Sequence, residues 1–147
     1  RYNMRSQIFA KSLPQPVTIG NLKRLQMLRE KPELKEKLWQ NALALQNGLK
    51  SRGFDIGETN SCVTPVYLEG TVGEATQLVY DLRENFGIFC SVVIYPVVPK
   101  GMIILRLIPT ASHTQEDIDQ TLDAFENVSG KLEAGEYSEE FATAVRT

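Results

Sequence analysis

Residues 88–108 read IFCSVVIYPVVPKGMIILRLI, and this stretch gives the clearest indication of a β-sheet in the chain. Two apolar runs rich in β-branched residues, 88–94 and 102–108, lie on either side of a short loop, and such runs are typical of strands. The loop, 95–101, holds two prolines, which preset part of its backbone. We therefore predict two strands joined by a stiff connection.

Apolar residues at helical spacing predict four helices outside this stretch. Gly53 and Gly87 each supply the left-handed residue that ends a helix. Thr114 followed by Asp117 has the spacing of a capping box, which marks a helix start. The predicted helices cover 16–30, the segment from Pro32 up to Gly53, 72–86 and 114–132.

One more strand is predicted over residues 62–69, where Pro65 lacks an amide donor and favours an edge position or a bulge. The elements then follow the order helix, helix, strand, helix, strand, strand, helix. This segregated order favours an α+β fold, with a small, mostly antiparallel sheet and helices packed on one of its faces. The residues beyond Gly135 are polar and are expected to be loose.

Composition excludes several classes of protein. The chain has 147 residues, 16 basic against 18 acidic groups, and therefore a net charge of −2, so we expect no nucleic-acid partner. Its apolar runs are shorter than the roughly 20 residues of a membrane span, and we expect none. Two cysteines without framework spacing suit a reducing compartment, which favours a cytoplasmic location. One histidine and two scattered cysteines do not form a metal motif.

Arg106 is the candidate for chemistry, because it interrupts a strand whose two faces are otherwise apolar. We expect it to be buried, and a buried guanidinium requires an anion. That anion is either an internal aspartate or glutamate, which the residues alone favour, or the carboxylate of a bound ligand. The loop 95–101 beside it is either one wall of a pocket or a plain connection between strands.

The other reactive side chains have structural interpretations. Cys62 and Cys90 lie in apolar runs and are expected to be small core residues. His113 precedes the capping box and is expected to support it rather than to form a catalytic pair with a cysteine. The acidic residues that follow belong to the first turn of a helix, where the helix dipole favours them.

Several short phrases recur here in a familiar order and spacing: FAKSLP at 9–14, LWQN at 38–41, GF at 53–54, TPV at 64–66, GI at 87–88, YPVVPKG at 95–101, LRL at 105–107 and HT at 113–114. Together they resemble the C-terminal third of the α-oxoamine synthases, pyridoxal-phosphate enzymes of the class II aminotransferase-like group. The resemblance covers residues 1–132. The proline loop looks most like that of 2-amino-3-ketobutyrate CoA ligase, and the chain as a whole is also similar to bacterial serine palmitoyltransferase.

The resemblance implies an enzyme that condenses an amino acid, glycine or serine, with an acyl-CoA and releases CO2. It implies that Arg106 binds the amino acid's carboxylate and that Val97 and Val98 line the substrate side of the loop. Pyridoxal 5'-phosphate is the implied cofactor, and its phosphate would be contacted across a homodimer interface at Ala10 and Lys11. Because alanine stands where the family has serine or threonine, backbone amides, Lys11 or Ser12 would make that contact.

In this family the lysine that binds the cofactor lies upstream of the segment matching residues 9–14. The resemblance therefore predicts that residues 1–15 connect to a large cofactor-binding domain, that 16–132 form a C-terminal small domain and that 133–147 are a polar tail. Such a chain is expected to be inactive alone. Two alternatives are a stand-alone α+β module that binds a small carboxylate, and a structural dimerisation domain in which Arg106 pairs internally.

Overall fold

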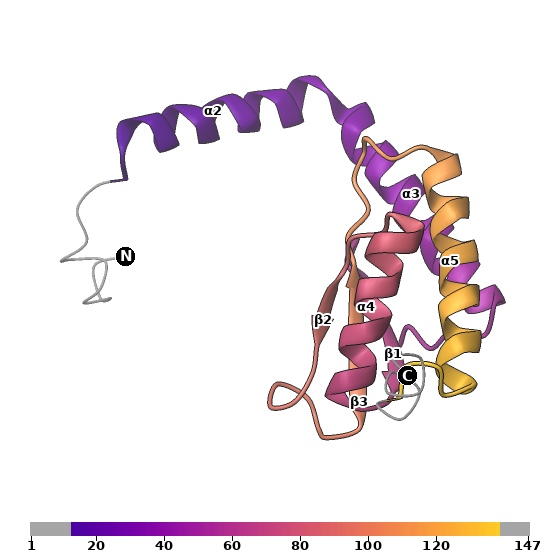
Figure 1. The fold of residues 1–147 in the computed structure, drawn as a ribbon. Coiled ribbons are helices and arrows are strands. Elements are labelled where there is room, and N and C mark those ends of the chain that lie inside the picture. Colours follow the sequence, from indigo (N-terminus) through magenta and orange to yellow (C-terminus); the bar gives the residue numbers. More distant parts are fainter. Residues whose placement is uncertain (1–12, 139–147) are drawn as a thin grey trace. The chain divides into compact units, whose positions relative to one another are not determined.

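The computed structural model describes residues 13–138, which form two compact units divided between Glu36 and Lys37 (Figure 1). The first unit contains helix α2, Gln15–Glu30, and the start of helix α3, Pro32–Ser51. A proline in the first turn of α2 suits a helix start, because the amide that it lacks would have no partner there. None of the α2 side chains is buried within the structure.

The second unit contains the rest of α3 and a three-stranded sheet with two further helices. The strands are β1, Thr64–Glu69, β2, Ser91–Val93, and β3, Met102–Leu107, and the helices are α4, Val72–Phe86, and α5, Gln115–Glu133. The strand order is β1-β3-β2, and both pairs are antiparallel. β1 lies at an edge, as Pro65 predicted. The predicted α+β class and the predicted order of elements are confirmed.

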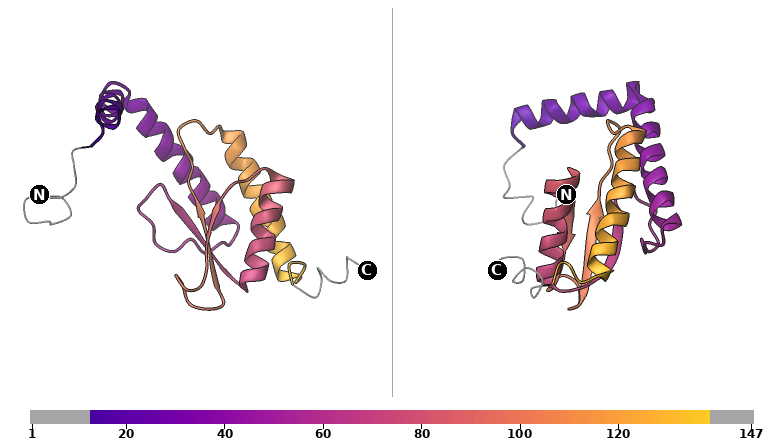
Figure 2. Two further views of the ribbon diagram at one scale, coloured as in Figure 1. Left: turned by 60° about the vertical axis from the view of Figure 1, so that its left-hand side comes forward. Right: turned by 45° about the vertical axis from the view of Figure 1, so that its right-hand side comes forward.

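Within residues 37–138, the helices cover one face of the sheet and leave the other open. Along β3, Ile103, Leu105 and Leu107 are buried, whereas the alternate residues are exposed or half-buried, which is the pattern of a strand with one solvated face. Figure 2 shows α4 and α5 together on one side of the sheet. The core between sheet and helices contains buried apolar side chains from α3, β1, α4, β3 and α5, among them Leu49, Val66, Leu78, Leu105 and Phe125, and Val92 of β2 packs against it while partly exposed.

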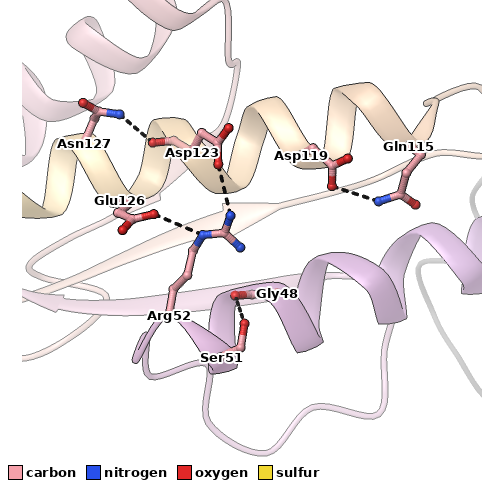
Figure 3. Close-up of polar contacts among 8 residues, drawn as sticks. All are labelled: Gly48, Ser51, Arg52, Gln115, Asp119, Asp123, Glu126 and Asn127. Carbon is pink, nitrogen blue, oxygen red and sulfur yellow. Dashed lines mark hydrogen bonds and ion pairs between the residues drawn. The ribbon is translucent and has the colours of Figure 1, made fainter.

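Helix α3 packs closely against α5. Gly48 lies where a Cβ atom would come within 2.4 Å of a methyl group of Leu122, so the absence of a side chain permits this approach. Just after α3, Arg52 pairs with two carboxylates of α5, Asp123 at 3.0 Å and Glu126 at 3.3 Å (Figure 3). Both carboxylates are exposed, so these ion pairs contribute little compared with the apolar contact.

All three strands are shorter than predicted, β3 by the one residue Ile108. Strand β1 begins at Thr64 instead of residue 62, and β2 covers only 91–93 of the predicted 88–94. The cause at β2 is the end of α4: Gly87 has a φ of 70°, and the amide of Ile88 donates to the carbonyl of Leu82. This arrangement is a left-handed helix cap. It uses the backbone of residues that would otherwise extend β2.

The predicted loose tail is wrong at Tyr137, whose side chain is only 8% exposed. Its hydroxyl donates a hydrogen bond of 2.5 Å to the carboxylate of Asp81 on α4. The same carboxylate oxygen accepts from Lys131 of α5 at 2.7 Å. These contacts hold the segment after α5 against α4 as far as the structure describes it.

Candidate functional site

Arg106 is exposed, so the expectation that it is buried is wrong. It alternates along β3 with Leu105 and Leu107, which face the helices, and it therefore projects from the open face of the sheet. The apolar residues on both faces of β3 suggested burial on both sides, but the helices among residues 37–138 cover one side. Met102, on the same open face as Arg106, is likewise exposed.

The neighbours of Arg106 follow from the strand register. β3 is the central strand, and Arg106 lies opposite Ser91 of β2 and Pro65 of β1. Its Nε donates a hydrogen bond to the hydroxyl of Ser91 at 3.1 Å. Within residues 13–138, no carboxylate forms an ion pair with this guanidinium. The internal-carboxylate alternative therefore has no support in the described part of the chain, and the guanidinium is available to an anion from outside it.

The proline loop, residues 95–101, lies at the start of β3, whereas Arg106 lies near the end of that strand. Arg106 is four residues from Met102, about 13 Å along an extended strand, and the loop precedes Met102. The Tyr95–Pro96 peptide bond is cis, and the ammonium of Lys100 lies 5.2 Å from the centre of the Tyr95 ring. Val97 is 79% exposed and Val98 is half-buried. The structure does not bring either valine together with Arg106.

A hollow of about 260 Å³ lies between this loop and the start of α4. Its walls are mainly apolar and come from Val72 of α4 and from Ile94, Tyr95 and Met102 around the loop, with Lys100 beside them. Neither Val97 nor Val98 lines it. The loop does form the wall of a hollow, but through residues other than the two valines that the resemblance indicates.

A second hollow, of about 170 Å³, is lined by residues that include Phe86, His113 and Asp117. The His113 ring is already engaged, because its Nδ1 accepts a hydrogen bond from the amide of Thr110 at 3.1 Å. Thr114 and Asp117 form the predicted capping box. His113 thus supports the turn before α5, and we assign it no catalytic role.

Neither cysteine has the setting of a nucleophile. Cys90 is buried, and burial raises the pKa of its thiol to about 11, so the thiol stays protonated at neutral pH. Cys62 is half-buried, and both thiols are free. No group of three or more potential metal ligands gathers within residues 13–138. Nor does any described helix combine the length and apolar character needed to cross a membrane.

The residues that the resemblance assigns to the cofactor, Ala10, Lys11 and Ser12, lie outside the described part of the chain. Within that part, Lys100 borders the mainly apolar hollow, and its ammonium already lies over Tyr95. Lys100 and the residues around it do not form a phosphate-binding site. Residues 13–138 therefore do not by themselves fit pyridoxal phosphate, although they do present a guanidinium for a carboxylate.

Sequence reasoning missed two features. Ser91 could not be found from the predicted strand ends, because pairing residue 94 with 102 would place Cys90 opposite Arg106, whereas the observed register places Ser91 there. Asp81 was detectable because it falls on the apolar stripe of α4 beside Leu78 and Leu82, and it is buried there. A charged residue in an apolar stripe requires a partner, which is the reasoning that singled out Arg106.

Comparison with known proteins identifies the family. The model for "Aminotransferase class I and II" matches residues 2–125. Cysteate-C-fatty acyltransferase of Capnocytophaga ochracea is 62% identical over 137 residues, which are 93% of this chain and 33% of that protein. 8-Amino-7-oxononanoate synthase of Thermoanaerobacter pseudethanolicus is 38% identical over 130 residues, 87% of this chain and 32% of that protein. The chain thus spans about one third of the length of these relatives.

Solved structures agree with this assignment. Serine palmitoyltransferase from S. paucimobilis with bound PLP–myriocin superposes with a TM-score of 0.73 at 30% identity, over 86% of this chain and 32% of that one. A further serine palmitoyltransferase structure with PLP gives a TM-score of 0.78 at 31% identity, over 91% and 34%. The chain therefore belongs to the aminotransferase class I and II family, as a relative of its pyridoxal-phosphate-dependent α-oxoamine synthases.

Proposed function

We propose that this chain supplies the substrate-carboxylate anchor of a pyridoxal-phosphate-dependent enzyme that joins an amino acid to a fatty acyl-CoA and releases CO2. The observation that carries the proposal is Arg106, a guanidinium on the open face of the sheet that no described carboxylate neutralises. Its terminal nitrogens can donate two parallel hydrogen bonds to a carboxylate, the geometry in which arginine binds this group best. A fixed carboxylate orients the bonds of the α-carbon for reaction.

The amino acid we propose is cysteate. The relative with 62% identity is a cysteate acyltransferase, whereas the serine palmitoyltransferases are 30–31% identical. Cysteate, serine and glycine share the α-carboxylate, so Arg106 would serve all three in the same way. Glycine and serine, which the sequence resemblance indicated, are the competing substrates to test.

The remainder of the site is proposed to lie outside residues 13–138. The cofactor, when bound, would supply the electron sink for the bond that breaks, and Lys11, Ser12 or the Ala10 amide would contact its phosphate across a homodimer interface. We propose residues 1–15 as the connection to a large domain, 16–132 as the small domain and 133–147 as the tail, in a cytoplasmic enzyme. Val97 and Val98 are proposed to line the substrate side of the loop 95–101.

Replacing Arg106 in the natural polypeptide that carries residues 1–147 tests the proposal. CoA release from palmitoyl-CoA is measured with L-cysteate, L-serine and glycine. We expect turnover with cysteate, and Arg106→Ala should raise the amino-acid KM by about 10- to 100-fold, because it removes hydrogen bonds to a charged group. Arg106→Lys keeps the charge but not the planar fork, and should fall between the two.

The matched control is Arg83→Ala, which removes an exposed arginine of α4 that pairs with its neighbour Glu84. It should leave the KM unchanged. An amino-acid KM that is the same in Arg106→Ala as in the parent enzyme would refute the anchor. The 147-residue chain alone is expected to release no CoA, and turnover by that chain would refute the proposed division of the active site.

A further inference from the structure

We propose that Ser91 is a positioning residue for Arg106: its hydroxyl holds the guanidinium so that the two terminal nitrogens face the substrate carboxylate. This inference rests on the proposed function, since it concerns the same anchor. The supporting contact is the hydrogen bond from Arg106 Nε to Ser91 Oγ, 3.1 Å long. It joins two residues that the antiparallel register places directly opposite each other on the open face.

The guanidinium nitrogen that donates to Ser91 determines which edge of the guanidinium can still bind a carboxylate. A guanidinium binds a carboxylate either through Nε and one terminal nitrogen, or end-on through both terminal nitrogens. Because Nε already donates to Ser91, the side edge is occupied and the end remains open. The structure therefore assigns end-on binding of the carboxylate, with the side chain held from one flank.

The other flank of Arg106 offers no equivalent contact. On β1, the residue opposite Arg106 is Pro65, whose ring has no hydrogen-bonding group. Ser91 is therefore the polar cross-strand neighbour that can fix the side chain. Arginine has many rotamers, and ordering them on binding weakens affinity. Holding the guanidinium before the substrate arrives removes part of that cost, so Ser91 should affect amino-acid binding more than the chemical step.

Two variants of equal shape separate the hydroxyl from the packing. Ser91→Thr keeps an oxygen acceptor and Ser91→Val removes it, and both residues suit a strand. In the natural polypeptide with palmitoyl-CoA, Ser91→Val should raise the KM for L-cysteate about tenfold, since a hydrogen bond to a charged group is lost. Ser91→Thr should stay within about twofold of the parent, and kcat should change by less than about threefold in both variants.

Ser112→Ala is the matched control, because Ser112 is an exposed residue of the turn before α5. It should change neither constant. Thermal melts followed by circular dichroism check that the variants fold, and Ser91→Ala replaces Ser91→Val if the valine variant does not. L-Serine and glycine are tested in parallel, so that the choice of amino acid does not decide the result.

A double-mutant comparison decides whether Ser91 acts through Arg106. We expect Ser91→Val to lower kcat/KM about tenfold beside Arg106 but not beside Arg106→Ala, in which there is no guanidinium to position. An equal loss in both backgrounds would show that Ser91 acts on the substrate directly and would overturn the inference. If Arg106→Ala raises the KM while Ser91→Val has no effect, this inference fails and the proposed function stands. If Arg106→Ala has no effect, the proposed function itself fails.

Discussion

Asp81 joins three parts of the second unit through one buried carboxylate. It accepts hydrogen bonds from Asn85 of its own helix, from Lys131 of α5 and from Tyr137 beyond α5. Burial raises the pKa of Asp81, but the hydrogen bonds from Asn85, Lys131 and Tyr137 outweigh it and hold the pKa below the ordinary value of 3.8. Burial and then Asp81 raise the pKa of Tyr137, so its hydroxyl keeps its proton. The cluster is therefore an anionic acceptor surrounded by donors.

We expect the stability of the chain to depend on pH through Asp81. A carboxylate whose pKa is depressed on folding stabilises the fold above its unfolded pKa, and this stabilisation is lost as the pH falls through the folded value. Asp81→Asn should therefore lower the free energy of unfolding by about 2–3 kcal/mol at pH 7. The difference from the parent chain should shrink below about pH 4. Urea denaturation of the 147-residue chain at several pH values measures it.

The hydrogen bond from Tyr137 to Asp81 has a control residue on α4, the helix that carries Asp81. Tyr137→Phe keeps the ring and removes the donor, so it should cost about 1–2 kcal/mol at pH 7. Tyr80 of α4 is 63% exposed, and Tyr80→Phe should cost almost nothing. If the two phenylalanine variants are equally stable, the hydrogen bond to Asp81 does not hold Tyr137 in place.

At the level of single residues, the sequence shows which charged residues are unusual but not where the fold places their side chains. Arg106 was recognised as unusual because its strand is apolar, but which side of the sheet the helices cover is a property of the packed fold. Periodicity could place Asp81 on the buried stripe of α4, with Asn85 one turn further on, but its other two donors, Lys131 and Tyr137, are 50 and 56 residues away. No local pattern contains such a distance.

Among the elements, α3 and α5 show how a missing side chain sets a distance between helices. A Cβ at Gly48 would lie 2.4 Å and 2.8 Å from the two methyl groups of Leu122, which is itself buried. Gly130 on α5 is also helical, but its Cβ would meet nothing within 4 Å. Replacement by alanine should therefore change stability in opposite directions at the two glycines.

Gly48→Ala should destabilise the chain, because the gain in helix propensity of about 1 kcal/mol is smaller than the overpacking cost of about 1–3 kcal/mol. Gly130→Ala should stabilise it by about 0.5–1 kcal/mol, because only the propensity changes. Thermal denaturation of both variants beside the parent chain measures these changes. A stabilising Gly48→Ala would mean that α3 and α5 are not in close contact.

Helices were predicted more accurately than strands for a physical reason. Capping signals are local: the predicted capping box of Thr114 and Asp117 lies at the start of α5, and the predicted Gly87 cap lies at the end of α4. A strand exists only where a partner meets it, so its bounds depend on residues elsewhere in the chain. Ile88 has the composition of a strand residue, yet its amide completes the cap of α4.

At the scale of the whole molecule, the second unit is a sheet with a covered face and an open face. The covered face buries the core, whereas the open face presents Arg106 with exposed or half-buried apolar residues of β3, Met102 and Ile104. The chain spans about one third of the length of its curated relatives. We interpret the open face as the part of the site that this chain contributes, with the remaining walls supplied from outside residues 13–138.

The most direct test is a crystal structure of the natural polypeptide with L-cysteate bound. We predict that both carboxylate oxygens lie about 2.7–2.9 Å from the terminal nitrogens of Arg106, with Nε still bonded to Ser91. A carboxylate held by other residues, with the Arg106 guanidinium out of hydrogen-bonding reach, would contradict the account.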